Sequence, residues 1–256
     1  MRSRLVQPPM PEPEPGVCLY AIGDIHGRSD LLAVLLDLIA AHAAGLPKEV
    51  RRRLVFLGDY IDRGPDSRGV IDMLCRPPPA GFERVCLRGN HEHFLLAFLE
   101  KPAEGMMWLV NGGRETLQSY GVPEEAIVAM RRSELAAAMN ALLPPSHKRF
   151  LDGLDLVHAS GGYLFVHAGV EPGVPLHQQS AETLLWIRQP FLASKDTFGG
   201  RVVVHGHTVS AEPQVRPNRI GIDTGAYASG RLTALALHGA HRQFISTPPD
   251  ARKEPG

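Results

Sequence analysis

Cysteine is scarce in this sequence, and neither sign of charge is in excess. Cys18, Cys75 and Cys86 form no CxxC pair, so we expect neither a thiolate zinc site nor a redox dithiol. Lysine plus arginine and aspartate plus glutamate number 27 each, which excludes the general positive field typical of nonspecific nucleic-acid binding. No apolar run is long enough to span a bilayer or to resemble a secretory signal. The sequence predicts a soluble cytoplasmic protein without nucleic-acid or membrane partners.

The composition is that of an ordinary folded protein, with 44% apolar and 21% charged residues in a chain of 256. This length predicts one domain at residues 17–247. The proline-rich residues 1–16 and the polar residues 248–256 are predicted to be a flexible arm and a flexible tail. Residues from about 102 to 153 are rich in alanine, leucine and methionine, which indicates a helical elaboration. No chemical motif is apparent in that segment.

Strands alternate with helices in the first part of the chain. Apolar segments at 17–22, 53–57 and 83–87 are each short enough for a buried strand, and each is followed by a polar loop and a helical pattern. This alternation predicts an α/β fold with its polar motifs at the carboxyl ends of the strands. From residue 156 onward β-forming segments dominate, which indicates a second sheet packed against the first.

Side chains that bind metals in proteins follow these predicted strands. Each has an ordinary explanation when taken alone, because aspartate is common in turns and most histidines are structural. Their shared position matters more, since loops at the carboxyl ends of adjacent strands converge. The residues concerned are Asp24, His26, Asp59, Asn90, His91, His167 and His207.

The donor types indicate the kind of metal. Oxygen ligands mixed with imidazoles, without thiolates, suit manganese, iron or zinc better than calcium. The donors are too numerous for one tetrahedral site, so we expect two ions that share a carboxylate. Asp59 stands alone in the second loop, between the other groups, and is the natural bridge.

Three motifs carry a family resemblance. GDIHG at 23–27, GDYIDRG at 58–64 and GNHE at 89–92 resemble the motifs of the serine/threonine phosphoprotein phosphatase family, within the calcineurin-like metallophosphoesterase superfamily. The similarity continues through FVHAG, LLWIR and VHGHT, and it is greatest to the bacterial branch. The resemblance implies the metallophosphoesterase fold, a two-sheet β-sandwich flanked by helices.

The resemblance also assigns metal ligands by motif position. One metal would be bound by Asp24, His26 and Asp59. The other would be bound by Asp59, Asn90, His167 and His207. VHGHT contains a second histidine, His205, but the family ligand follows the glycine, which leaves His205 as a supporting or strand-end residue.

Catalytic roles follow in the same way. His91 corresponds to the family's general acid, Asp62 to the carboxylate that orients it, and Arg63 to a phosphate-binding guanidinium. Arg188 ends a looser match, LLWIR, and is either a second phosphate-binding residue or a packing residue beside a tryptophan. Asn90 would also contribute to substrate binding.

The implied enzyme is a protein serine/threonine phosphatase. It would hydrolyse phosphate monoesters of a phosphoprotein or phosphopeptide by direct attack of a metal-bridging hydroxide between two divalent ions, with manganese expected first and iron or zinc as alternatives. A dinucleoside polyphosphate hydrolase of the same superfamily is the main alternative. A binding module with a degenerate site is a further one, although such a module would be expected to lack some of the ligands or the acid. The sequence makes no prediction of the oligomeric state.

Overall fold

The first predicted strand forms the middle of a sheet that is buried on both faces. The computed structural model describes residues 11–248, and in it β1 spans Val17–Ile22. Cys18, Tyr20 and Ile22 contact the helical layer. The alternating residues Val17, Leu19 and Ala21 contact a second sheet. A strand covered on both sides needs apolar residues at every position, which explains its continuous apolar run.

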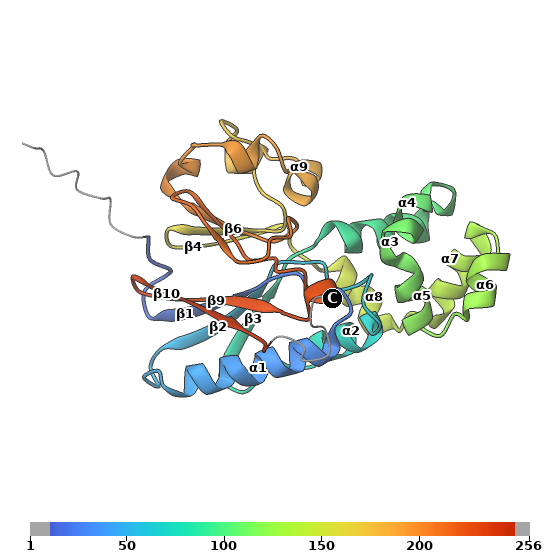
Figure 1. Cartoon of the computed structure of the whole chain (residues 1–256), viewed down its shortest axis with the longest axis horizontal. Coiled ribbons are helices and arrows are strands. Elements are labelled where there is room, and N and C mark those ends of the chain that lie inside the picture. Colours follow the sequence, from blue (N-terminus) through green and yellow to red (C-terminus); the bar gives the residue numbers. More distant parts are fainter. Residues whose placement is uncertain (1–10, 249–256) are drawn as a thin grey trace, which may run out of the picture.

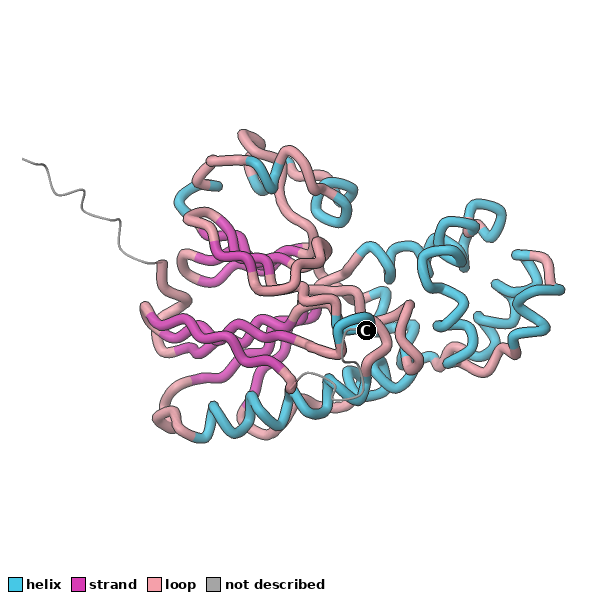
Figure 2. The backbone as a smooth tube through the Cα atoms, in the orientation of Figure 1, coloured by secondary structure: helices cyan, strands magenta, loops and turns pink. Residues whose placement is uncertain are grey.

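Within residues 11–248 the strands form two five-stranded sheets, ordered β10-β9-β1-β2-β3 and β4-β5-β6-β8-β7. The first sheet contains β1, β2 (Arg51–Phe56), β3 (Phe82–Cys86), β9 (Thr233–His238) and β10 (His241–Ser246). The second contains β4 (Val157–Ser160), β5 (Tyr163–Val166), β6 (Val202–His205), β7 (Gln214–Val215) and β8 (Arg219–Gly221). They stack as two layers, with an apolar core between them (Figure 2).

Helices cover the outer faces of this sandwich. In Figure 1, α1 and α2 lie beneath the first sheet, α9 lies above the second, and the segment from α4 to α7 projects from one end. The longer helices are α1 (Ser29–Ala44), α2 (Ser67–Cys75), α3 (Asn90–Glu100), α7 (Arg132–Leu142) and α8 (Pro145–Asp152). The shorter ones are α4 (Met106–Trp108), α5 (Arg114–Ser119), α6 (Glu124–Ala129), α9 (Ala181–Trp186) and α10 (Ala226–Ser229). None of the helices between residues 11 and 248 combines the length and hydrophobicity that a bilayer crossing requires.

The predicted α/β fold, a two-sheet sandwich flanked by helices, is confirmed. One part of the expectation was wrong, because the strand at Thr233–His238 returns to pair antiparallel with β1 and does not join the second sheet. Residues 11–16, expected in the flexible arm, are hydrogen-bonded, since Glu14 N donates to Ser160 Oγ at 3.1 Å and Arg51 N donates to Gly16 O at 2.9 Å. The rest of the predicted arm, and residues 249–256 of the predicted tail, lie outside the described residues.

Candidate metal centre and active site

Residues other than glycine adopt left-handed backbone conformations in the loops after β1, β2 and β6. The φ angles are 47° at His26, 52° at Asp59, 73° at Asp62, 68° at Arg63 and 61° at His207. Such conformations cost on the order of 1–3 kcal/mol each and concentrate at functional sites, where the surrounding structure enforces them. The loops after different strands are thus held in shapes that direct these side chains to one place.

The buried carboxylate of Glu92 connects the loop after β2 to the residues between β3 and α3. It accepts hydrogen bonds from the backbone N–H groups of Asp59 (2.9 Å), Tyr60 (2.8 Å), Ile61 (3.3 Å) and Gly89 (2.9 Å). Burial and the nearby charge of Asp59 raise the pKa of Glu92 to about 7. The sequence motif contains Glu92, but sequence reasoning gave it no role; its contacts assign it to positioning the second loop.

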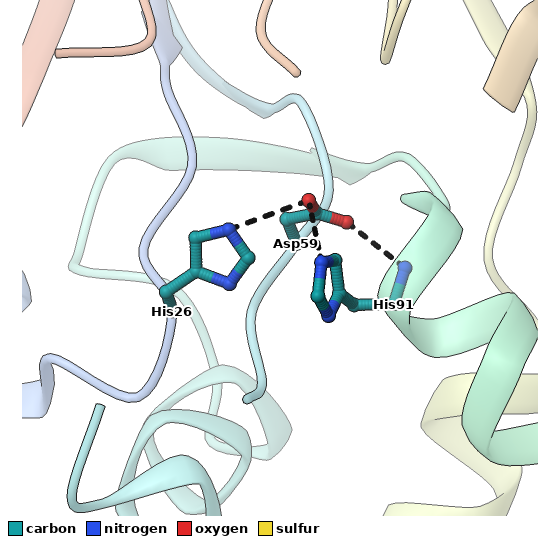
Figure 3. A group of neighbouring side chains, drawn as sticks. All are labelled: His26, Asp59 and His91. Atoms are coloured by element: carbon teal, nitrogen blue, oxygen red, sulfur yellow. Dashed lines mark hydrogen bonds and ion pairs between the residues drawn. The ribbon is translucent and has the colours of Figure 1, made fainter. Parts of the chain in front are cut away.

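One cluster of metal-binding side chains joins the loop after β1, the loop after β2 and the start of α3 (Figure 3). His26 Nε2 lies 3.5 Å from Asp59 Oδ2, and His91 Nε2 lies 3.8 Å from the same oxygen. His26 Nδ1 donates to Ile61 O at 2.8 Å, so its Nε2 presents a lone pair, which Arg63 Nη1 meets at 3.0 Å. Burial lowers the pKa of His26 to about 3, which keeps that ring neutral and able to bind a cation.

A second cluster lies on the other side of Asp59. His167 Nδ1 donates to Leu57 O at 3.0 Å, and its Nε2 therefore presents a lone pair. That lone pair faces Asn90 Oδ1 at 2.8 Å and Asp59 Oδ1 at 3.5 Å. Burial lowers the pKa of His167, which disfavours a proton on Nε2 between these atoms. A divalent cation fits this nitrogen and the two facing oxygens. His207 completes the cluster, with Nδ1 2.9 Å from Asn90 Oδ1.

Asp24 lies against this centre with an unsatisfied oxygen. Its Oδ2 accepts from His207 N at 3.0 Å, but Oδ1 is buried without a hydrogen-bond partner among the described residues, as is His207 Nε2. Burial, followed by the charges of Asp223 and Asp59, raises the pKa of Asp24 well above its usual range. Buried carboxylates that repel one another need a cation to remain ionised. The residues present therefore fit divalent metal ions.

His91 also belongs to a polar network directed away from the metal clusters. His91 Nδ1 donates to Asp62 Oδ2 at 2.6 Å, and the same carboxylate accepts from Trp108 Nε1 (2.9 Å) and Thr116 Oγ1 (2.5 Å). Burial lowers the pKa of His91, but Asp59 and the bond to Asp62 outweigh it and raise the pKa overall. Burial also raises the pKa of Asp62, and the hydrogen bond from His91 opposes this shift. Trp108 and Thr116 come from the helical segment in which the sequence showed no chemistry.

A cleft of about 520 Å³ opens onto this centre. Its charged and polar walls include Arg63, Asn90, His91, Arg188 and His207, and its aromatic walls include Phe94, Trp186 and Tyr227. The predicted residues Asp24, His26, Asp62 and His167 lie behind this surface and are buried. His205 lies elsewhere, with its ring packed edge-on against Phe191 at 5.1 Å and its Nδ1 bonded to Gly206 O at 3.0 Å. Tyr227, which stacks under the Arg63 guanidinium at 4.9 Å, had no sequence signal.

Known proteins of two activities are similar to this chain. Serine/threonine-protein phosphatase 2 of Escherichia coli is 30% identical over 222 residues, 84% of this chain and 90% of that protein. An asymmetrical bis(5'-nucleosyl)-tetraphosphatase of Bacillus thuringiensis is 27% identical over 230 residues, 84% of this chain and 88% of that protein.

Solved structures share the fold. The cold-active protein-tyrosine phosphatase of a Shewanella species matches with a TM-score of 0.59 at 16% identity, covering 91% of this chain and 83% of that chain. A protein serine/threonine phosphatase of Saccharomyces cerevisiae matches with a TM-score of 0.51 at 17% identity, covering 94% and 82%. The family model described as calcineurin-like phosphoesterase matches residues 19–230, which include every residue of the two clusters. The chain belongs to the calcineurin-like phosphoesterase family.

Proposed function

We propose that the protein is a binuclear metal-dependent phosphomonoesterase that removes phosphate from phosphoserine and phosphothreonine in proteins. One observation carries the proposal: the His91–Asp62 pair, 2.6 Å apart, adjoins a carboxylate, Asp59, that belongs to two clusters of metal-binding atoms. In this arrangement His91 would donate a proton beside a centre that would activate water. Such a combination is what hydrolysis of a phosphate ester with a basic leaving group requires.

The proposed ligands divide into two sets around Asp59. Asp24, His26 and Asp59 would hold one ion, and Asp59, Asn90, His167 and His207 would hold the other. Manganese is the metal we propose first, because the donors are oxygens and imidazoles without thiolates. When bound, the two ions would supply Lewis acidity and a water molecule of lowered pKa.

The chain's own residues would bind the ester and complete the proton transfer. Arg63 and Arg188 lie on the walls of the cleft, where their guanidinium groups would pair with phosphate oxygens. His91 Nε2 faces the centre, and its proton would pass to the departing serine or threonine oxygen as the P–O bond breaks. Asp62 keeps the proton on Nδ1 through its hydrogen bond, so the ring presents Nε2 toward the substrate.

The charge around the cleft favours a single phosphate over a polyphosphate chain. Within residues 11–248, Arg63 and Arg188 are the lysine or arginine residues that line the cleft. The adjoining hollow shares Phe94 and Trp186 with the cleft and contains the exposed carboxylates of Glu104 and Glu182. These carboxylates would repel further phosphate groups.

A second candidate function is hydrolysis of dinucleoside polyphosphates, the activity named for some of the relatives. The aromatic walls of the cleft favour it, because Phe94, Trp186 and Tyr227 offer ring faces or edges to a nucleobase. The acidic hollow weighs against it, and we place it second.

A direct comparison of substrates decides between the two. Purified protein is stripped of metal, reloaded with Mn²⁺, Fe²⁺ or Zn²⁺, and given a phosphoserine peptide and diadenosine tetraphosphate at matched concentrations. We expect kcat/KM to be higher for the peptide, with Mn²⁺ giving the highest rate. A higher kcat/KM for diadenosine tetraphosphate with every metal would overturn the proposed function.

A further inference from the structure

A second cavity lies at the opposite end of the strands that carry the metal centre. It has a volume of about 850 Å³ and is lined by residues at the starts of β6 and β8, including Val202 and Arg219. These two strands are parallel, and their other ends lead to His207 and Asp223. At about 3.3 Å per residue, β6 alone separates the cavity from the metal centre by roughly 13 Å. The cavity is therefore distinct from the catalytic cleft.

The cavity combines four cationic side chains with aliphatic walls. Lys195, Arg201, Arg216 and Arg219 line it, and no aspartate or glutamate within residues 11–248 does so. None of these four side chains forms an ion pair with another described residue. The lining of this cavity, among the described residues, is therefore cationic and contains no carboxylate.

Arg219 is the most informative of the four, because its side chain is only 9% exposed. Its Nη2 donates to Leu192 O at 2.6 Å, while its Nε is buried and has no hydrogen-bond partner among residues 11–248. Burying an ionised group without full hydrogen bonding is costly unless a partner compensates. An anion in the cavity would compensate the guanidinium charge through the atoms of Arg219 that line the cavity.

The walls indicate what else the ligand carries. Leu192, Ala193, Val202 and Pro217 contribute aliphatic surface, and no aromatic ring of the described chain lines the cavity. Its volume lies in the range of sites for small organic molecules and far exceeds what an inorganic phosphate fills. Asn218, just before β8, fixes the segment at residues 194–196, because its Nδ2 donates to Ser194 O and to Asp196 O, both at 2.9 Å. The cavity is thus formed before any ligand arrives, which lowers the entropy cost of binding.

We propose that this cavity binds a small organic anion with an aliphatic body and a carboxylate, phosphate or sulfate group. The aliphatic body would lie against the apolar wall, and the anionic group would pair with the guanidinium groups. This site is independent of the proposed phosphatase activity, because it contains none of the residues assigned to catalysis.

Titration of decanoate into the full-length, metal-loaded protein tests the proposal. The probe variant is Arg201→Gln/Arg216→Gln, which removes two exposed charges of the cavity. The control is Lys148→Gln/Arg149→Gln, which removes two exposed charges on α8 and so changes the net charge equally. Calorimetry should show decanoate binding about tenfold weaker in the probe variant and unchanged in the control.

A third variant tests the aliphatic part of the site without altering charge. Ala193 is an exposed lining residue, so Ala193→Trp should fill the cavity and abolish decanoate binding without disturbing the core. The proposal is overturned by equal decanoate affinities in the two charge variants, by unchanged affinity in Ala193→Trp, or by the absence of saturable binding at millimolar decanoate.

Discussion

The indole N–H of Trp108 donates a hydrogen bond to the carboxylate of Asp62 at 2.9 Å. Trp108 belongs to the helical segment that projects from the sandwich, whereas Asp62 lies in the loop after β2 (Figure 1). Since Asp62 also accepts from His91 Nδ1, the projecting segment fixes the group that orients the proposed acid. A part of the chain without a chemical motif of its own is thereby joined to the active site.

Trp108→Phe tests this link, because it keeps an aromatic ring in the core and removes the N–H together with part of the buried indole ring. We expect kcat for a phosphoserine peptide to fall about tenfold with KM and metal content unchanged, since one hydrogen bond that orients the acid is lost. Steady-state kinetics and metal analysis provide the measurement. Tyr120→Phe is the matched control, as it removes a buried hydrogen bond to His147 in the same segment. Equal kinetic losses in both variants would reduce Trp108 to a stabilising residue.

Asp59→Asn should lower metal content more than His26→Ala does. Asp59 belongs to both clusters, so its substitution removes charge from two sites, whereas His26 belongs to one. Metal per chain in each purified variant is measured by elemental analysis. Two tightly held ions in Asp59→Asn would contradict its role as the bridging ligand.

Arg63→Ala and Arg188→Ala should each weaken inhibition by inorganic phosphate, which we expect to compete with the substrate, by about tenfold, while both metal ions remain. A charge-assisted hydrogen bond contributes about 1.5–3 kcal/mol, and a guanidinium is not a metal ligand. Inhibition constants measure this effect. An unchanged inhibition constant in Arg188→Ala would place that exposed arginine outside the substrate site.

Glu92→Gln should destabilise the metal-free protein by about 1–3 kcal/mol, because an amide N–H₂ would replace one of the oxygens that now accept backbone N–H groups. Urea unfolding in the presence of a chelator gives the free energy of unfolding. Glu100→Gln, at the exposed end of α3, is the control and should change the free energy of unfolding little. If both variants unfold at the same urea concentration, Glu92 does not hold the loops together.

Much of the fold could be predicted because its sequence signals are local. The apolar run of β1 and the loop motifs that follow β1, β2 and β3 each lie within a few consecutive residues. The strand β10 could not be predicted, because an edge strand with polar, partly exposed residues lacks the apolar signal of a central one. The placement of β9 beside β1 depends on pairing between strands more than 200 residues apart in the sequence. The local pattern of apolar residues contains no information about such pairing.

The candidate site likewise contains residues with a local sequence signal and residues that only tertiary contacts identify. Side chains in contiguous motifs, such as Asp62 and His91, could be named in advance, and the structure places them 2.6 Å apart. Trp108 and Tyr227 could not be named, since their relevance arises only from tertiary contact with Asp62 and Arg63. Both residues lie in helical segments outside the motifs, and the sequence around them does not indicate their tertiary contacts.

Substitution of His91 tests the central claim most directly, because a general acid and a metal ligand respond differently. A serine alkoxide is strongly basic and needs a proton to depart, whereas the leaving group of 4-nitrophenyl phosphate does not. His91→Asn should lower kcat for a phosphoserine peptide by about 10²- to 10⁴-fold, lower it much less for 4-nitrophenyl phosphate, and retain both metal ions. Equal losses of kcat on the two substrates, or loss of a metal ion from the variant, would contradict the account.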